Sequence, residues 1–188
     1  MMVLGIMGSP RLGGNTDLLM DEALKGARSV GAFAEKIIVD DLDIAPCREI
    51  CGCTKDGRCV IRDDMDDIYR GLEEADVLIV GSPIFFYGLP SQLKALVDRC
   101  QVLWARKYVL KQEPLRQGRK GAFIAVGATK GADLFDGSKL TMKYFFNAIG
   151  FEYAGELLVW NVDEKGAVKK HPTAMADAYE LGKKIAGR

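Results

Sequence analysis

The chain has 188 residues, of which 48% are hydrophobic and 28% charged, and its 26 basic residues balance 26 acidic ones. A formal net charge of zero excludes the strongly basic surface that binding to nucleic acid or to an acidic membrane needs. This length predicts one globular domain, residues 1–188, with a substantial core. The first apolar run ends at Met7, too early for a signal peptide or a membrane span, so we expect a cytoplasmic protein with reduced thiols.

Five short apolar runs, each typical of a buried strand, alternate with amphipathic stretches along the chain. The runs lie near residues 2–7, 34–39, 77–80, 122–126 and 157–160. Helices are expected near residues 15–29, 63–72, 90–100, 138–149 and 172–185. This alternation predicts an α/β fold, a doubly wound five-stranded parallel sheet with helices on both faces. With the strand order 2-1-3-4-5, the loops after strands one, three and four lie together at one edge of the sheet.

The first of these loops, residues 8–16, carries small, polar and cationic residues into the start of a helix. Unpaired N–H groups and the dipole make a helix N-terminus attractive to anions. The loop adds the hydroxyls of Ser9 and Thr16, the amide of Asn15 and the guanidinium of Arg11. We therefore predict a phosphate site here, the alternative being a plain strand-to-helix turn. The Walker lysine and the dinucleotide glycine fingerprint are both absent, which favours a mononucleotide such as FMN.

The other two loops offer what an isoalloxazine ring needs, a flat apolar wall and nearby backbone N–H and C=O groups. Residues 81–88 read Gly-Ser-Pro-Ile-Phe-Phe-Tyr-Gly. We expect Phe85 to face the ligand, while at least one of the next two aromatic residues packs in the core or against a second copy of the chain. Gly127 and Thr129, in the third loop, are expected at the far side of the ring.

Together, the two loop motifs resemble those of the NADPH-dependent FMN reductase family, and in particular its iron–sulfur flavoprotein branch. The resemblance rests on Gly8-Ser9-Pro10-Arg11 with Gly14-Asn15-Thr16, and on residues 81–88 followed by residues 92–99. It implies a flavodoxin-like fold, non-covalently bound FMN, and a homodimer or homotetramer with the flavin near a subunit interface. Transferred position by position, it implies a phosphate site made by Ser9, Arg11, Asn15 and Thr16. It also implies a ring site made by Pro83, Ile84, Phe85 and Gly88.

Four of the five cysteines lie in one loop after the second strand, in an insertion of about residues 44–62. Four thiols so close together can surround one metal centre. The resemblance implies a 4Fe–4S cluster, but the family's Cys-x2-Cys-x2-Cys run is replaced here by the spacing Cys-x3-Cys-x-Cys-x5-Cys. A cluster, thiols without metal, and zinc all stay open. The candidate ligands are Cys47, Cys51, Cys53 and Cys59, whereas Cys100 is expected in the core.

If FMN binds here, the flavin carries the chemistry, and the protein contributes binding, orientation and electrostatics. We therefore predict an FMN-dependent NAD(P)H oxidoreductase that passes reducing equivalents to a small-molecule or protein acceptor, with no catalytic side chain. The alternatives are an iron–sulfur flavoprotein electron carrier supplied by a ferredoxin-type partner, and a nucleotide-sensing or scaffold domain. His171 is expected to cap a helix. The basic run 106–120 either meets the 2′-phosphate of NADP or is solvated surface.

Overall fold

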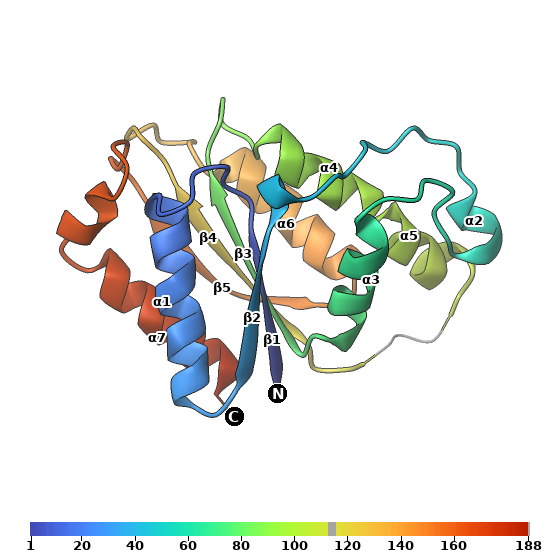
Figure 1. Cartoon of the computed structure of the whole chain (residues 1–188), viewed down its shortest axis with the longest axis horizontal. Coiled ribbons are helices and arrows are strands. Elements are labelled where there is room, and N and C mark those ends of the chain that lie inside the picture. Colours follow the sequence, from blue (N-terminus) through green and yellow to red (C-terminus); the bar gives the residue numbers. More distant parts are fainter. Residues whose placement is uncertain (113–115, 188) are drawn as a thin grey trace.

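A parallel sheet forms the centre of the molecule, which we describe from a computed structural model over residues 1–112 and 116–187 (Figure 1). The strands are β1 (Met2–Met7), β2 (Phe33–Ile38), β3 (Val77–Pro83), β4 (Lys120–Val126) and β5 (Glu152–Val159). Their order is β2-β1-β3-β4-β5, and every neighbouring pair is parallel. The predicted doubly wound α/β sheet and its strand order are confirmed. The order reverses between β1 and β3, so a crevice opens at the carboxyl ends of these strands.

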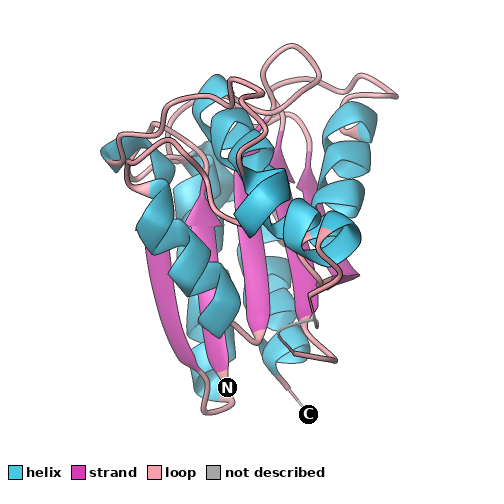
Figure 2. Cartoon of the chain, turned by 90° about the vertical axis from the view of Figure 1, so that its right-hand side faces the viewer, coloured by secondary structure: helices cyan, strands magenta, loops and turns pink. Residues whose placement is uncertain are grey.

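Helices cover both faces of the sheet, as the two views show (Figures 1 and 2). The α-helices are α1 (Asn15–Ser29), α2 (Cys53–Asp56), α3 (Met65–Glu74), α4 (Ser91–Arg99), α5 (Gln101–Trp104), α6 (Asp136–Ala148) and α7 (Ala174–Ala186). The chain also forms the 3-10 helices η1 (Val39–Asp41) and η3 (Ala167–Lys170) and the π-helical turn η2 (Ala105–Val109). Among the residues described, no helix combines the length and apolar character that crossing a membrane would require.

Side chains that alternate along the strands fill two separate cores. From β3, Leu78 and Val80 pack with α3, α4 and α6, whereas Val77 and Ile79 pack with α1 and α7. This period of two, with both sets apolar, is what a parallel sheet covered on both faces requires. The sheet is therefore fixed from both sides, and its carboxyl edge is left for loops.

Two helix and strand boundaries are informative. β5 begins at Glu152 and not near residue 157, because its first half alternates exposed and half-buried residues and so shows no apolar run. At the start of α7, the prediction for His171 is confirmed. Its Nδ1 accepts hydrogen bonds from the N–H groups of Thr173 (3.3 Å) and Ala174 (3.1 Å).

Two glycines allow α1 and α7 to touch backbone to backbone. A Cβ atom at Gly26 of α1 would lie 1.9 Å from the carbonyl oxygen of Tyr179, and one at Gly182 of α7 would lie 1.8 Å from that of Ala23. Only hydrogen fits at either position. This contact brings the connection between β5 and α7 alongside the N-terminus of α1, where the predicted phosphate loop ends (Figure 1).

We predict that Gly182→Ala lowers the free energy of unfolding by about 1–3 kcal/mol, because the new methyl group forces α7 away from α1. Gly71→Ala in α3 is the matched control, since its Cβ would make an ordinary 3.4 Å contact with Leu4. The higher helix propensity of alanine should make that control neutral or more stable by up to about 1 kcal/mol. Urea denaturation measures both variants, and equal stabilities would contradict the close helix contact.

Candidate functional site

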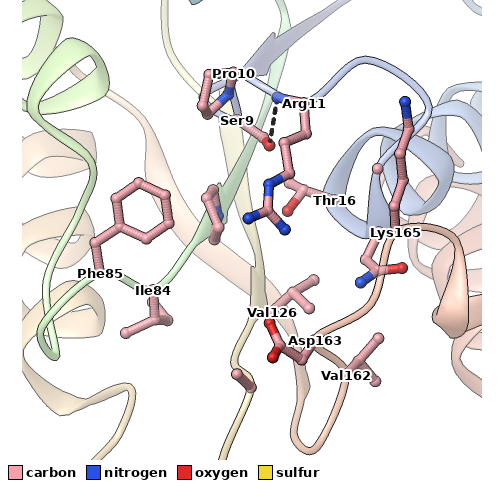
Figure 3. Close-up of a pocket in the computed structure, with 14 residues that line it drawn as sticks. Ser9, Pro10, Arg11, Thr16, Ile84, Phe85, Val126, Val162, Asp163 and Lys165 are labelled. Atoms are coloured by element: carbon pink, nitrogen blue, oxygen red, sulfur yellow. Dashed lines mark hydrogen bonds between the residues drawn. The ribbon is translucent and has the colours of Figure 1, made fainter.

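A pocket opens at the carboxyl ends of the strands, where the predicted loops meet (Figure 3). It opens to solvent, and about 550 Å³ of space lies within it when this open solvent is counted. The structure brings every predicted residue of the first loop together with the side chains of the second loop. The pocket is lined by Ser9, Pro10, Arg11, Gly14, Asn15, Thr16, Pro83, Ile84, Phe85, Val126, Ala128, Val162, Asp163 and Lys165.

The first and second loops meet because they leave neighbouring strands at the same height. The N–H of Gly8 donates to the carbonyl oxygen of Gly81 over 2.8 Å. A Cβ atom at Gly81 would lie 3.1 Å from Cγ2 of Thr16, so the methyl group of Thr16 packs against this glycine. Thr16 is buried and lines the pocket together with Ser9. Both predicted hydroxyls are therefore held beside the pocket by strand geometry.

Hydrogen bonds within the first loop fix its shape without a ligand. The N–H of Arg11 donates to Ser9 Oγ over 3.2 Å (Figure 3), and the N–H of Gly14 donates to the carbonyl oxygen of Arg11 over 2.9 Å. Gly13 adopts a φ of 66° and donates its N–H to Asp17 Oδ2 over 2.8 Å. These N–H groups are therefore used within the loop itself, and a first helical turn such as that of α1 generally attracts anions.

The side chain of Asn15, predicted to hold phosphate, is placed differently. Its Nδ2 donates to the carbonyl oxygen of Glu164 over 2.9 Å, and its Oδ1 accepts from the N–H of Val168 over 3.1 Å. Both ends of the amide therefore bind the segment after β5. Asn15 still lines the pocket, and its backbone N–H belongs to the first turn of α1.

The negative charge of Asp17, in the first turn of α1, is paired within the protein. Its carboxylate lies 2.7 Å from Nζ of Lys36, which also lies 2.6 Å from Asp21. Burial by itself would lower the pKa of Lys36, but the hydrogen bonds to the two carboxylates outweigh it and raise that pKa. Lys36 therefore stays charged and neutralises Asp17 beside the loop.

Three predicted cofactor residues shape the loops and do not line the pocket. Gly88 closes a two-residue turn by exchanging hydrogen bonds of 3.0 and 2.9 Å with Phe85. Gly127 donates its N–H to the end of β5, and the carbonyl oxygen of Thr129 accepts from the N–H of Asn161. The third loop contributes Ala128 to the pocket instead.

The turn after β3 carries three aromatic residues with different surroundings. Phe85 lines the pocket (Figure 3), whereas the ring of Phe86 is fully exposed. Tyr87 packs on the third loop, because a Cβ atom at Gly131 would lie 2.5 Å from its hydroxyl oxygen. Phe86 and Tyr87 have φ values of 48° and 62°, a region that is costly for bulky side chains. Strain of this kind is typical of a functional segment.

Sequence reasoning missed a fourth segment of the pocket, the loop after β5. It supplies Val162, Asp163 and Lys165. The signal was present, since the polar run from Asn161 to Gly166 follows an apolar strand end as the other loops do. β5 lies at the sheet edge, separated from β1 by β3 and β4, and the packing of α7 on α1 helps to bring its loop beside the first one.

The base of the cysteine loop is clamped by Arg99 of α4, which is almost fully buried. Its guanidinium donates to the carbonyl oxygens of Ala45 (2.8 Å) and Ile61 (3.3 Å), one from each end of the loop. It also forms a two-point ion pair with Asp63, at 2.5 and 3.0 Å. The predicted loop therefore leaves the core and returns to it at the same place, the guanidinium of Arg99.

The four thiols of this loop have different surroundings. Cys47 and Cys51 are exposed, whereas Cys53 and Cys59 are half-buried. The first three line one cavity and Cys59 lines another. In the described part of the chain, no three His, Cys, Asp or Glu side chains are placed to share a metal ion. As placed here, the thiols do not fit a four-cysteine cluster. Cys100 is buried in the core, as expected.

The cysteine cavity and the pocket at the strand ends are separate sites. Their linings share no residue. Figure 1 shows α2, within the cysteine loop, at the far right of the molecule, whereas the first loop lies above α1 on the other side of the sheet. Within one chain, the two sites therefore lie apart, on different sides of the sheet.

Most of the basic run 106–120 has structural partners. Arg106 donates to the carbonyl oxygen of Gly57 over 2.7 Å and pairs with Glu73. Arg119 is buried and donates to the carbonyl oxygens of Leu72 and Ile149. Arg116 forms an ion pair with Asp76. These three arginines therefore have partners within the protein, in place of the two alternatives of a 2′-phosphate contact or a solvated surface. Residues 113–115 of the run lie outside the described residues.

The family model described as NADPH-dependent FMN reductase matches residues 1–142, which include both loop motifs. The chain belongs to this family. The matched range also contains the cysteine loop and ends within α6.

Individual proteins and a solved structure that are similar to this chain support the same family and fold. The chain is 34% identical to an iron-sulfur flavoprotein of Methanocaldococcus jannaschii, over 99% of this chain and 96% of that protein. It is 31% identical to Bacillus subtilis YwqN, named as an NAD(P)H-dependent FMN-containing oxidoreductase, over 84% of each. Its fold matches a flavodoxin from the domain Archaea with a TM-score of 0.60 and 17% identity, covering 99% of this chain and 96% of that one. The flavodoxin-like fold is confirmed.

We predict that Asp63→Asn lowers the free energy of unfolding by about 3–5 kcal/mol at neutral pH, because Arg99 is left buried without its counter-charge. Asp98→Asn on the same helix is the control, since Asp98 pairs with Lys94 at the exposed surface; it should cost less than about 1 kcal/mol. Equal losses in the two variants would contradict the clamp.

Acid should weaken the same ion pair. Burial would raise the pKa of Asp63, but the hydrogen bonds from Arg99 and from the N–H groups of Ala45 and Met65 outweigh it and hold that pKa below its usual value. The pair therefore contributes stability above the unfolded pKa, near about 4, and loses it as the pH falls through the lower folded value. The difference in free energy of unfolding between wild type and Asp63→Asn should shrink to zero over that pH range, as measured by denaturation curves.

Proposed function

We propose that the chain binds FMN in the pocket at the strand ends and works as an NAD(P)H-dependent oxidoreductase. The single observation that supports this most is the division of the pocket into a polar, cationic end at α1 and an apolar end at Phe85. A mononucleotide flavin has the same division, a charged phosphate at one end and a flat ring at the other. Membership of the family supports the same cofactor and co-substrate.

At the phosphate end, the chain offers donors of three kinds. The first-turn N–H groups of α1 provide a fixed partial positive charge. The hydroxyls of Ser9 and Thr16 add neutral donors, and Arg11 adds a guanidinium that can bind two phosphate oxygens. Hydrogen bonds to a charged group contribute about 1.5–3 kcal/mol each, so this end would supply much of the affinity.

At the ring end, the contribution is mainly apolar. Phe85, Ile84, Pro83 and Val126 line this side of the pocket. The N–H of Ile84 already donates to the carbonyl oxygen of Val126 over 2.9 Å, and the N–H of Phe85 to Gly88. These residues would therefore orient the ring by contact and exclude water from one face. Asp163, in the same pocket, would accept hydrogen bonds from the hydroxyls of the ribityl chain.

When bound, FMN supplies hydride and electron transfer, chemistry that no side chain of the pocket can supply. The residues of the chain bind and orient: Arg11 and α1 hold the phosphate, and Phe85 fixes the plane of the ring. Orientation of this kind lowers the entropy cost of bringing two reactants together. We propose that the acceptor is a small molecule or a protein.

We further propose a homodimer or homotetramer. Phe86 supports this, because its ring is fully exposed on a turn whose backbone is strained. The turn lies next to Phe85 at the mouth of the pocket, so a second copy covering Phe86 would also cover the ring end of the site.

The test is anaerobic mixing of the FMN-loaded protein with NADPH and, separately, with NADH. Reduction should bleach the flavin absorbance near the visible maximum within seconds, at a rate that saturates with the nucleotide. Free FMN at the same concentration is the control for the uncatalysed reaction. A bound flavin that neither nucleotide reduces faster than free FMN would contradict the reductase function.

A second candidate function is an electron carrier with an iron–sulfur cluster in the cysteine loop. The relative named as an iron-sulfur flavoprotein favours it, since the alignment with that relative covers 99% of this chain. The chemistry of the four thiols also favours it, although their placement does not fit a cluster. We therefore derive no electron path through this loop.

Iron and sulfide analysis of anaerobically purified protein tests the carrier proposal. A cluster-bearing chain would hold about four irons and four sulfides. Cys51→Ser should then lose them, because Cys51 stands at the shifted position of the motif, whereas Cys100→Ser in the core should keep them. Protein without iron would end the carrier proposal and leave the reductase proposal intact.

A further inference from the structure

We propose that Lys165 is a second cation for the phosphate and makes the pocket select a phosphorylated flavin over one without phosphate. We also assign Asn15 as the residue that positions Lys165. This inference rests on the proposed FMN site and extends it, since neither role follows from the loop motifs of the sequence.

Lys165 lies against the phosphate loop although it comes from the opposite end of the chain. It lines the same pocket as Arg11 and Thr16. A Cβ atom at Gly13 would lie 3.6 Å from Cε and 4.0 Å from Nζ of Lys165. Figure 3 shows Arg11 and Lys165 on opposite sides of Thr16, with the ammonium of Lys165 pointing up towards the first loop. A phosphate at the first turn of α1 would therefore lie between the two segments that carry these cations.

Asn15 holds the segment that carries this lysine. Its amide donates to the carbonyl oxygen of Glu164 and accepts from the N–H of Val168, so Lys165 lies between two anchored residues. The Asn15 side chain is 9% exposed, which protects these hydrogen bonds from water. The start of α1 and the position of Lys165 are thus coupled directly.

The charges of the pocket show why a second cation matters. A phosphate monoester carries about 1.5 to 2 negative charges at neutral pH. The charged side chains that line the pocket are Arg11, Lys165 and Asp163. Without Lys165, the charges of Arg11 and Asp163 would sum to zero, and the side chains of the pocket would offer no net positive charge to the phosphate. Part of the loop's own N–H donors also point inward, towards Ser9 and Asp17.

The test compares the affinities of FMN and riboflavin, which differ only in the phosphate, by quenching of flavin fluorescence on the full chain freed of flavin. Lys165→Gln should weaken FMN about tenfold and leave riboflavin unchanged. Lys165→Arg should keep most of the FMN affinity. Lys169→Gln is the matched control, because Lys169 is exposed nearby in η3 and does not line the pocket; it should bind both flavins as wild type does.

The role of Asn15 is tested in the same assay. Asn15→Ala should weaken FMN more than riboflavin in the wild-type background, and should add much less in the Lys165→Gln background. Unchanged FMN affinity in Lys165→Gln, or an equal loss for both flavins, would overturn this inference while the FMN site stands. Wild-type protein that binds neither flavin would overturn the proposed function and this inference with it.

Discussion

The contact between α1 and α7 is the constraint on which the arrangement of the site depends. Gly26 and Gly182 bring two helix backbones together where any larger residue would separate them. This contact lays the connection between β5 and α7 across the start of α1. Asn15 then fastens the connection with two hydrogen bonds of its side chain. A pocket that the sheet alone would leave open on one side is closed by a segment from the far end of the chain.

The second organising interaction, the ion pair of Arg99 with Asp63, lies on the opposite face of the sheet. It holds both ends of the cysteine loop at one point of the core. The pocket at the strand ends and the cysteine loop are therefore separate regions of one sheet fold and share no residues. In this sequence, a shifted cysteine spacing stands beside an intact phosphate-loop motif.

The sheet and the first loop were predictable because they follow from local patterns. Apolar runs of strand length and a polar loop before an amphipathic helix each carry their own signal, as Ser9 and Thr16 do. The role of Asn15 was not predictable, since its partners lie about 150 residues away in sequence and depend on helix packing. Lys165 was missed for the same reason. Gly127 and Thr129 were placed by strand order alone, which does not determine which residue of a loop turns inward.

We propose that the first turn of α1 binds the phosphate of FMN and that Phe85 contacts its ring. A crystal structure of the protein grown with FMN tests this most directly. We predict the phosphate within hydrogen-bond distance of the Thr16 hydroxyl and the first N–H groups of α1, with the isoalloxazine against Phe85. FMN bound elsewhere, or bound with its phosphate away from α1, would contradict the account.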